Sequence, residues 1–305
     1  LFTFVSKLIL IPFKLILCLL LIVVLGSCAS DDENSIGLGY SDIYNLPEIP
    51  YNYSNPNFPD TFTPYVFGFD NTPSDNTITD HGVTLGRVLF YDKKLSSDNT
   101  ISCASCHKQE FGFSDNTPKS IGVSGEQTFR NSMGFANAGF YAAENFSWDH
   151  QAATLEDQIL IPITDELEMG ITLENLVEKL SDLAYYEPLF KNAFGNKQIT
   201  STKISKALSQ FVRSIYSYNT KYDRGIEITK DIFIDFPNFT TKENLGKDIF
   251  NGKLTPGAIG TCITCHLPNS TPLHFDQPIP ENANQVIFSG AEPDNIGLDI
   301  DLNVE

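Results

Sequence analysis

The sequence predicts a mainly α-helical protein with long loops. Two segments, 173–180 and 204–215, place apolar residues at the three- and four-residue spacing of one helix face. The alternation of apolar and polar residues that is typical of half-buried strands is scarce. With 305 residues and 41% hydrophobic content, the chain is long enough for one large or two modest domains with a hydrophobic core.

Residues 1–28 are interpreted as a lipoprotein-type signal peptide. Lys7 and Lys14 are followed by an unbroken apolar run over 15–25, which is too short to span a bilayer comfortably. Small residues stand directly before Cys28, as in a lipobox, so Cys28 is expected to carry lipid after cleavage. The alternatives are an uncleaved anchor and an ordinary signal peptide. All of these interpretations predict an exported protein.

Residues 29–80 are rich in Asn, Asp, Pro and Tyr and show no sustained period. They are expected to form an extended linker or to wrap loosely on the body of the protein. Regular structure should begin near residue 81, where Val83, Leu85, Val88 and Leu89 can line one face of a helix.

Two further helices have recognisable starts. Thr154 with Asp157 resembles a capping box, and the helix that follows is expected to end before Pro162. Thr172 is a predicted N-cap for the helix over 173–180. The apolar faces of this helix and of 204–215 are most simply explained as core.

Two Cys-x-x-Cys-His units carry the chemistry of the sequence. They consist of Cys103, Cys106 and His107, and of Cys262, Cys265 and His266. Zinc would need four converging thiolate or imidazole ligands, which the two units can in principle supply. A thioredoxin-like dithiol would need a βαβ context, which the sequence does not show.

Covalent haem c explains more of these observations. Two cysteines one helical turn apart can form thioethers to the haem vinyl groups, and the next histidine can then ligate the iron. The exported compartment is where c-type haem is attached, and the two units use every mature cysteine except the lipidated one. The sequence therefore predicts two covalently bound haem c groups.

Around these units the chain resembles the bacterial dihaem cytochrome c peroxidases, a family that includes the related methylamine-utilisation maturase. The resemblance covers about residues 76–305 and is carried by the stretches 85–107, 130–140, 146–170 and 245–266. It implies two cytochrome-c-like, mainly helical domains: a peroxidatic haem domain over 81–225 and an electron-transfer haem domain over 226–305.

The resemblance also implies roles for individual residues. Glu168 matches the distal glutamate that acts as general acid/base, and Gln158 matches a glutamine that orients bound peroxide. Trp148 matches the residue between the two haems, where it would carry electrons; a core tryptophan is the compatible alternative. Taken without the motif, Glu168 would be a solvated loop carboxylate. Asn131 matches a calcium ligand, which makes calcium a candidate third cofactor.

The first departure from the family pattern concerns activation. Many members keep a second histidine on the peroxidatic iron in a Ser-Ile-Gly-His loop, but Val123 occupies that position here. An isopropyl group cannot ligate iron, and His81 and His150 are weak substitutes. The His107 haem is therefore expected to be open in the ferric state.

The second departure from the family pattern concerns the C-terminus. The family continues past residue 305, so the chain is interpreted as truncated at its C-terminus. The sixth ligand of the second iron then lies beyond the sequence. Met133 and Met169 are the only methionines, and His274 is interpreted as a surface residue.

The leading function is reduction of hydrogen peroxide to water with electrons from a small cytochrome c or copper protein. The alternatives are a dihaem electron carrier without turnover and a maturase that oxidises a partner protein. A net charge of −18 disfavours nucleic acid and suits a basic donor. The predicted location is the periplasm, anchored to the membrane through Cys28; cell-surface exposure and a homodimer remain open.

Overall fold

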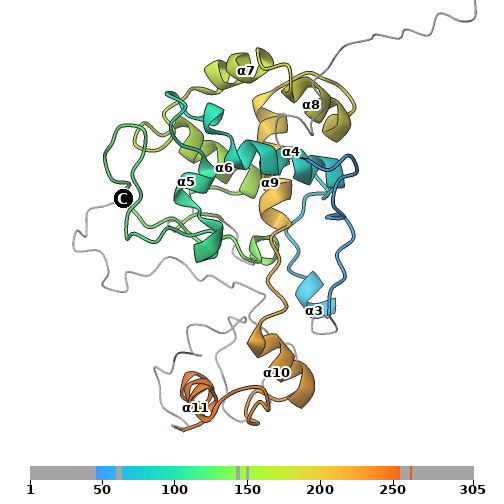
Figure 1. The fold of residues 1–305 in the computed structure, drawn as a ribbon, viewed down its shortest axis with the longest axis vertical. Helices are drawn as coiled ribbons and strands as arrows, with labels where there is room; N and C mark the ends of the chain where they lie inside the picture. Colours follow the sequence, from blue (N-terminus) through green and yellow to red (C-terminus); the bar gives the residue numbers. More distant parts are fainter. Residues whose placement is uncertain (1–45, 60–63, 142–144, 149–150, 255–261, 263–305) are drawn as a thin grey trace, which may run out of the picture. The chain divides into compact units, whose positions relative to one another are not determined.

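The computed structural model describes residues 46–59, 64–141, 145–148, 151–254 and 262. Helices dominate this part of the chain, which contains isolated β-bridges but no β-strand, so the predicted fold class is confirmed (Figure 1). The helical elements are α3 (Pro64–Phe67), α4 (Asp80–Tyr91), η1 (Lys93–Leu95), α5 (Cys103–Cys106), η2 (Gln109–Phe111), η3 (Ala138–Phe140), α6 (Leu155–Thr164), α7 (Leu173–Ser181), α8 (Tyr186–Phe194), α9 (Ser201–Arg213), α10 (Lys221–Thr229) and α11 (Thr241–Phe250).

Helices α4 and α9 form the centre of the main core, with α8 against α4 and α6 against α9 (Figure 1). Their apolar faces are the predicted ones: Leu85 and Leu89 of α4 and Ile204 of α9 are fully buried. A glycine permits the close crossing of the two helices, since a Cβ on Gly86 would overlap the backbone carbonyl of Ala207.

Helix α6 begins as predicted and ends later than predicted. The Thr154 hydroxyl accepts a hydrogen bond from Asp157 N at 3.1 Å. The expected stop before Pro162 is wrong, because α6 continues to Thr164. Proline lacks the N–H that would donate to the carbonyl of Gln158, so the last turn has one helical hydrogen bond fewer. The tertiary contacts of that turn hold it in place: Ile163 is fully buried, and the Pro162 carbonyl accepts a hydrogen bond from Met169 N.

Helix α7 follows the sequence prediction throughout. The hydroxyl of Thr172 accepts a hydrogen bond from Asn175 N, so the predicted N-cap is confirmed. Leu176 and Leu180 are fully buried, and the partly buried Leu173 and Val177 pack beside them against the same core.

Part of the predicted linker is held against the body. The backbone N–H groups of Tyr53 and Ser54 both donate to Asp80 Oδ1, each at 2.8 Å. Leu46 is buried in the main core. The segment also contains the short helix α3, which sequence periodicity did not reveal. Residues 29–45 of the predicted linker lie outside the described residues.

A buried ion pair joins α6 to α9. Arg213 is 1% exposed, and its two terminal nitrogens donate to the two carboxylate oxygens of Glu156 at 2.6 and 2.9 Å. Asn76 also donates to Glu156, and Arg213 Nε donates to Asn71. Burial alone would raise the pKa of Glu156, but the hydrogen bonds and charge of Arg213 lower it below its ordinary value.

Helices α10 and α11 surround a smaller cluster around Phe236, which is 1% exposed and stacks edge-on with Tyr222 and Phe239. Asn244 of α11 accepts a hydrogen bond from Phe236 N and donates one to Phe236 O.

None of the helices in the described residues combines the length and hydrophobicity of a membrane span.

Candidate functional site

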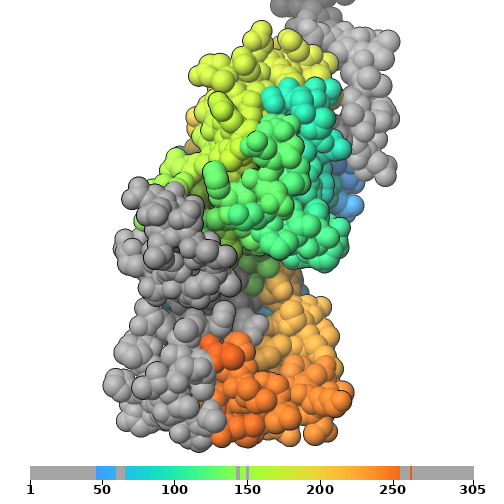
Figure 2. All heavy atoms as spheres, turned by 90° about the vertical axis from the view of Figure 1, so that its left-hand side faces the viewer, coloured from blue at the N-terminus to red at the C-terminus, as the bar shows by residue number. Residues whose placement is uncertain are grey.

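A cavity of about 370 Å³ brings together most of the predicted site residues. Its wall is formed by the end of α5, residues within 128–141 and 146–148, α6, the loop after α6 and Val212 of α9. Predicted residues that line it are Cys106, His107, Asn131, Trp148, Gln158 and Glu168. The loops that follow α5, coloured green, form much of the surface seen in Figure 2.

Helix α5 is the single turn that carries the first cysteine pair. Ser102 and Ser105 form a capping box around its start. Cys103 and Cys106 lie at the two ends of the turn as free thiols. Burial raises the pKa of Cys103 to about 12 and also raises that of Cys106. Both thiols are therefore protonated at neutral pH. They lie one helical turn apart, which is the spacing that thioether attachment to a haem requires.

His107 follows directly and has a defined ring orientation. Its Nδ1 lies 2.9 Å from two backbone carbonyl oxygens, of Phe113 and of Met133. Two acceptors at one nitrogen place the proton on Nδ1 and leave the Nε2 lone pair free for a metal. Burial lowers the pKa of His107, which favours the neutral form that ligates iron. Phe135 stacks on the imidazole at 4.0 Å.

Glu168 has the electrostatic character of a proton-transfer group. Burial, with the negative charge of Asp165 as a smaller cause, raises its pKa to about 7. The Glu168 carboxyl would otherwise titrate near 4.5. A carboxyl with a pKa close to neutral can both accept and release a proton at that pH. Glu168 is thus partly enclosed and is not the solvated loop carboxylate of the alternative interpretation.

Gln158 presents an unused acceptor in the cavity that Glu168 also lines. It lies on α6 and lines the same cavity. Its Oε1 is buried and has no hydrogen-bond partner among the described residues. Buried polar atoms are normally paired, so an orphaned oxygen at a cavity wall indicates a ligand that donates to it.

Trp148 lies at the edge of the cavity and is 50% exposed. Its indole N–H donates to the backbone carbonyl of Asn131 at 2.8 Å. The alternative interpretation as a core tryptophan is therefore wrong. This hydrogen bond anchors the indole, and half of the side chain stays exposed.

The side chain of Asn131 is already engaged within the protein. Its Oδ1 accepts a hydrogen bond from Ser114 at 3.2 Å, and its Nδ2 donates to Thr117 O at 3.0 Å. No cluster of three or more His, Cys, Asp or Glu side chains suited to a metal ion occurs in the described part of the chain. Calcium at Asn131 stays a prediction.

The residues around the first unit fit a covalently attached haem. Cys106, His107 with its free Nε2 and Gln158 with its unpaired Oε1 line one cavity with a largely apolar wall, and Cys103 lies at the other end of the same helical turn as Cys106. Of the second unit, the structure describes Cys262, which is exposed. Cys265 and His266 lie outside the described residues, as do Cys28, His150 and His274.

Val123 does not line the cavity. Its backbone N–H donates to the carbonyl of Glu168 at 2.9 Å. Its side chain faces Gly170, where a Cβ would lie 3.0 Å from Val123 Cγ2. His81 is exposed at the start of α4. Among the described residues, neither position therefore supplies a second histidine to the cavity.

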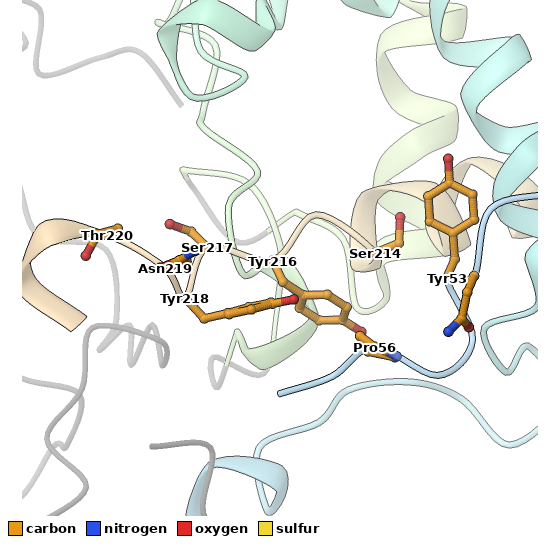
Figure 3. A pocket seen from close by; sticks show the side chains of 9 residues that line it. Tyr53, Pro56, Ser214, Tyr216, Ser217, Tyr218, Asn219 and Thr220 are labelled. Atoms are coloured by element: carbon orange, nitrogen blue, oxygen red, sulfur yellow. The ribbon is translucent and has the colours of Figure 1, made fainter. Parts of the chain in front are cut away.

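A second cavity, of about 500 Å³, contains none of the predicted site residues (Figure 3). Tyrosines, neutral polar side chains and Pro56 line it, and none of its lining residues is charged or carries a thiol. Burial raises the pKa of Tyr216 to about 12, so this phenol stays protonated. The chemistry of the molecule is therefore assigned to the first cavity.

Sequence reasoning missed several contributors to the site. The carbonyls of Phe113 and Met133 orient His107, but backbone acceptors leave no signal in residue type. Asp165 lines the cavity and raises the pKa of Glu168. The run of acidic residues over 165–168 was a signal that could have identified it.

Comparison with known proteins supports the interpretation of the first Cys-x-x-Cys-His unit as a haem site. Residues 80–231 match the family model of di-haem cytochrome c peroxidase. The chain is 31% identical to the methylamine utilization protein MauG of Methylophilus methylotrophus over 64% of this chain and 54% of the relative. It is also 31% identical to the cytochrome c551 peroxidase of Nitrosomonas europaea over 60% of this chain and 50% of the relative.

A solved structure extends the likeness to three dimensions. It is a MauG-like protein associated with microbial copper homeostasis, with 32% identity and a TM-score of 0.59 over 70% of this chain and 57% of that one. The chain spans about half the length of the curated relatives it matches. The matched family implies two haem c groups. The chain belongs to the di-haem cytochrome c peroxidase family.

Proposed function

We propose that the protein reduces hydrogen peroxide to water, with Glu168 as the group that transfers the proton. The observation that carries this proposal is a carboxyl with a pKa of about 7 in the same cavity as a neutral, oriented His107. Cleavage of peroxide needs a proton to move from one oxygen to the other so that water can leave. A positioned carboxyl that titrates near the working pH performs that transfer efficiently.

The other residues of the cavity prepare for this step. Cys103, Cys106 and His107 would hold a haem here, and that haem would supply the electrons that peroxide accepts. Gln158 Oε1 can accept a hydrogen bond from peroxide and hold it near Glu168, since it has no partner among the described residues. The apolar part of the wall, including Phe135 and Val212, limits the water that competes with peroxide and keeps the Glu168 carboxyl poorly solvated.

A second candidate is oxidation of a side chain on a partner protein, as a maturase would perform. The observation that favours it is the 50% exposure of Trp148 at the cavity edge. An exposed indole beside a haem offers a route for electrons from a docked protein. If the protein is a peroxidase, the same indole ring conducts electrons from the second haem.

Steady-state peroxide consumption by the full-length dihaem protein with a reduced donor tests the proposal. Oxidation of two one-electron donor molecules for each peroxide consumed would support a peroxidase. Oxidation of a protein substrate would support the maturase. Two haems that are reversibly reducible without turnover would indicate an electron carrier and would overturn both enzyme proposals.

The His107 haem is expected to be high-spin and accessible when both irons are ferric, because Val123 cannot ligate iron and does not line the cavity. Peroxide should then react without prior reduction. Electron paramagnetic resonance of the oxidised protein and stopped-flow mixing with peroxide check this. Low-spin bis-histidine signals from both haems, or a lag that only pre-reduction abolishes, would contradict it.

The proposed donor is a small basic cytochrome c or cupredoxin. The net charge of −18 favours encounter with a cationic partner mainly through the association rate. A calcium ion at Asn131 belongs to the same proposal: Oδ1 accepts one hydrogen bond, from Ser114, and its second lone pair would bind the ion.

The proposed location is the periplasm, with lipid on Cys28 as the anchor. Cys28→Ala is expected to move the full-length protein from the membrane fraction to the soluble fraction, because the acyl chains that bind the bilayer are lost. Fractionation followed by haem staining measures this. Persistent membrane association would instead indicate an uncleaved helix or a bound partner.

A further inference from the structure

The loop over 165–171, which carries Glu168, is held by its backbone on two sides. On the α6 side, Met169 N donates to Pro162 O at 3.1 Å and Ile171 N donates to Ile163 O at 3.0 Å. Beside η1, Ser97 N donates to Met169 O at 2.9 Å. These three bonds fix residues next to Glu168, whose own N–H donates to Asp165 O within the loop at 3.1 Å.

The segment over 120–128 closes the remaining side. Val123 N donates to Glu168 O at 2.9 Å. Gly122 is buried and lies so close that a Cβ on it would overlap the carbonyl oxygen of Leu167 and would lie 2.9 Å from that of Glu168. Both obstacles are backbone atoms, which cannot rotate away as the end of a side chain can. Only glycine therefore permits this contact.

This segment is itself a closed loop. Gly122 N donates to Glu126 O at 3.1 Å, and Thr128 N donates to Ser120 O at 2.9 Å. Gly125 completes its tip, since Gly125 N donates to Gly122 O at 3.0 Å. The loop is therefore held in one conformation by its own backbone.

The base of the segment is tied to the loop that follows His107. The hydroxyl of Ser120 donates to Asp115 Oδ2 at 2.6 Å, and Lys108 Nζ bonds Asp115 Oδ1 at 2.7 Å. Lys108 is the residue directly after His107. A chain of short contacts therefore runs from the haem-ligating histidine, through the 120–128 segment, to the backbone of Glu168.

We propose that Gly122 is the positioning residue for Glu168, setting the place of its carboxyl relative to His107 by backbone contact. The inference deepens the proposed function and rests on it, because it assigns what holds the proton-transfer group. Segment 120–128 then holds the 165–171 loop in a fixed position relative to the loop that follows His107.

The first test compares Gly122→Ala with Gly125→Ala in the full-length haem protein. A methyl on Gly122 must push the 165–171 loop away, so the Glu168 carboxyl should become better solvated. Gly125 has φ +78° and nothing within 4 Å of an added Cβ, so its variant adds backbone strain to the same segment without a new contact. Gly122 has no positive φ, so its variant adds the contact alone, and Gly125→Ala is the control for a disturbance of the segment that does not touch the 165–171 loop.

Infrared difference spectra follow the Glu168 carboxyl directly, with its band identified by its loss in Glu168→Gln. Gly122→Ala is expected to lower the titration midpoint by about one unit toward the ordinary range. Peroxide cleavage should slow on the order of 10- to 100-fold, as for other misplaced catalytic groups. Gly125→Ala should leave the midpoint unchanged. An unchanged midpoint in Gly122→Ala would overturn the proposal.

A second pair of variants keeps the test decisive if Gly122→Ala does not fold. Gly170→Ala places a Cβ 3.0 Å from Val123 Cγ2, at a residue with φ +61°. It should lower the infrared midpoint, and adding Val123→Ala should recover part of the shift because that Cγ2 is removed. Absence of recovery would show that segment 120–128 does not bear on Glu168.

The infrared midpoint separates failure of this inference from failure of the proposed function. If Glu168→Gln retained normal turnover, Glu168 would lose its role as proton-transfer group. The midpoint of its carboxyl would still report whether Gly122 positions it.

Discussion

Glu168→Gln is expected to slow peroxide cleavage by about 10²- to 10⁴-fold while both haems remain attached. Glutamine keeps the size and one acceptor of the side chain but cannot take up the proton. Stopped-flow decay of peroxide, measured with the ferric and the half-reduced full-length protein, gives the rate. Absorption spectra of the same samples establish that the haem content is unchanged.

The pH dependence of the rate of peroxide cleavage provides a second test of Glu168. With a pKa of about 7 in the folded protein, the charged form of Glu168 that accepts the proton becomes populated as pH rises through 7. The wild-type rate should therefore increase across that range, and the increase should disappear in Glu168→Gln.

The matched control is Glu166→Gln, two residues away in the same loop on an exposed side chain. Because Glu166 does not line the cavity, its variant should keep the wild-type rate and pH profile. Near-normal turnover of Glu168→Gln would remove this carboxyl from the mechanism. An equal loss in both variants would point to damage of the loop rather than to lost proton transfer.

Arg213→Met is expected to lower the free energy of unfolding by about 3–5 kcal/mol. Removing one partner of a buried ion pair leaves the other charge without compensation. Here Glu156 would lose two short hydrogen bonds from a side chain that is 1% exposed. Urea unfolding of the full-length protein at pH 7 measures the change.

The loss should depend on pH in a defined direction. In the folded protein the pKa of Glu156 lies below its ordinary value of 4.5, so the pair stabilises the fold above that pH. This contribution is lost as pH falls through the folded pKa. The difference between Arg213→Met and the wild type should therefore shrink in acid.

Lys206→Met on the same helix is the control. Lys206 pairs with the largely exposed Asp75, and exposed pairs contribute about 0–1 kcal/mol. A double variant, Glu156→Gln with Arg213→Met, should recover part of the stability because no buried charge is left. Equal decreases in the free energy of unfolding for Arg213→Met and Lys206→Met would show that burial does not increase the contribution of the ion pair to stability.

Local patterns in the sequence predicted α4, α6, α7 and α9, whereas α8, α10 and α11 were not predicted. The spacing of apolar residues identified α4, α7 and α9, and Thr154 and Thr172 marked helix starts that the structure confirms. These features depend on residues within a few positions of each other. The end of α6 was predicted wrongly, because burial of Ile163 and the Met169 hydrogen bond to Pro162 outweigh the local preference of proline.

By itself, the sequence determined the chemical groups: two Cys-x-x-Cys-His units, a glutamate and a glutamine with a recognisable spacing, and the absence of histidine at Val123. Only the tertiary structure decided their properties. It orients His107 through two distant carbonyls, buries Glu168 beside Asp165 so that its pKa rises, and holds its loop against Gly122. A pKa and a ring orientation depend on solvation and on atoms far apart in the chain, which residue identity does not encode locally.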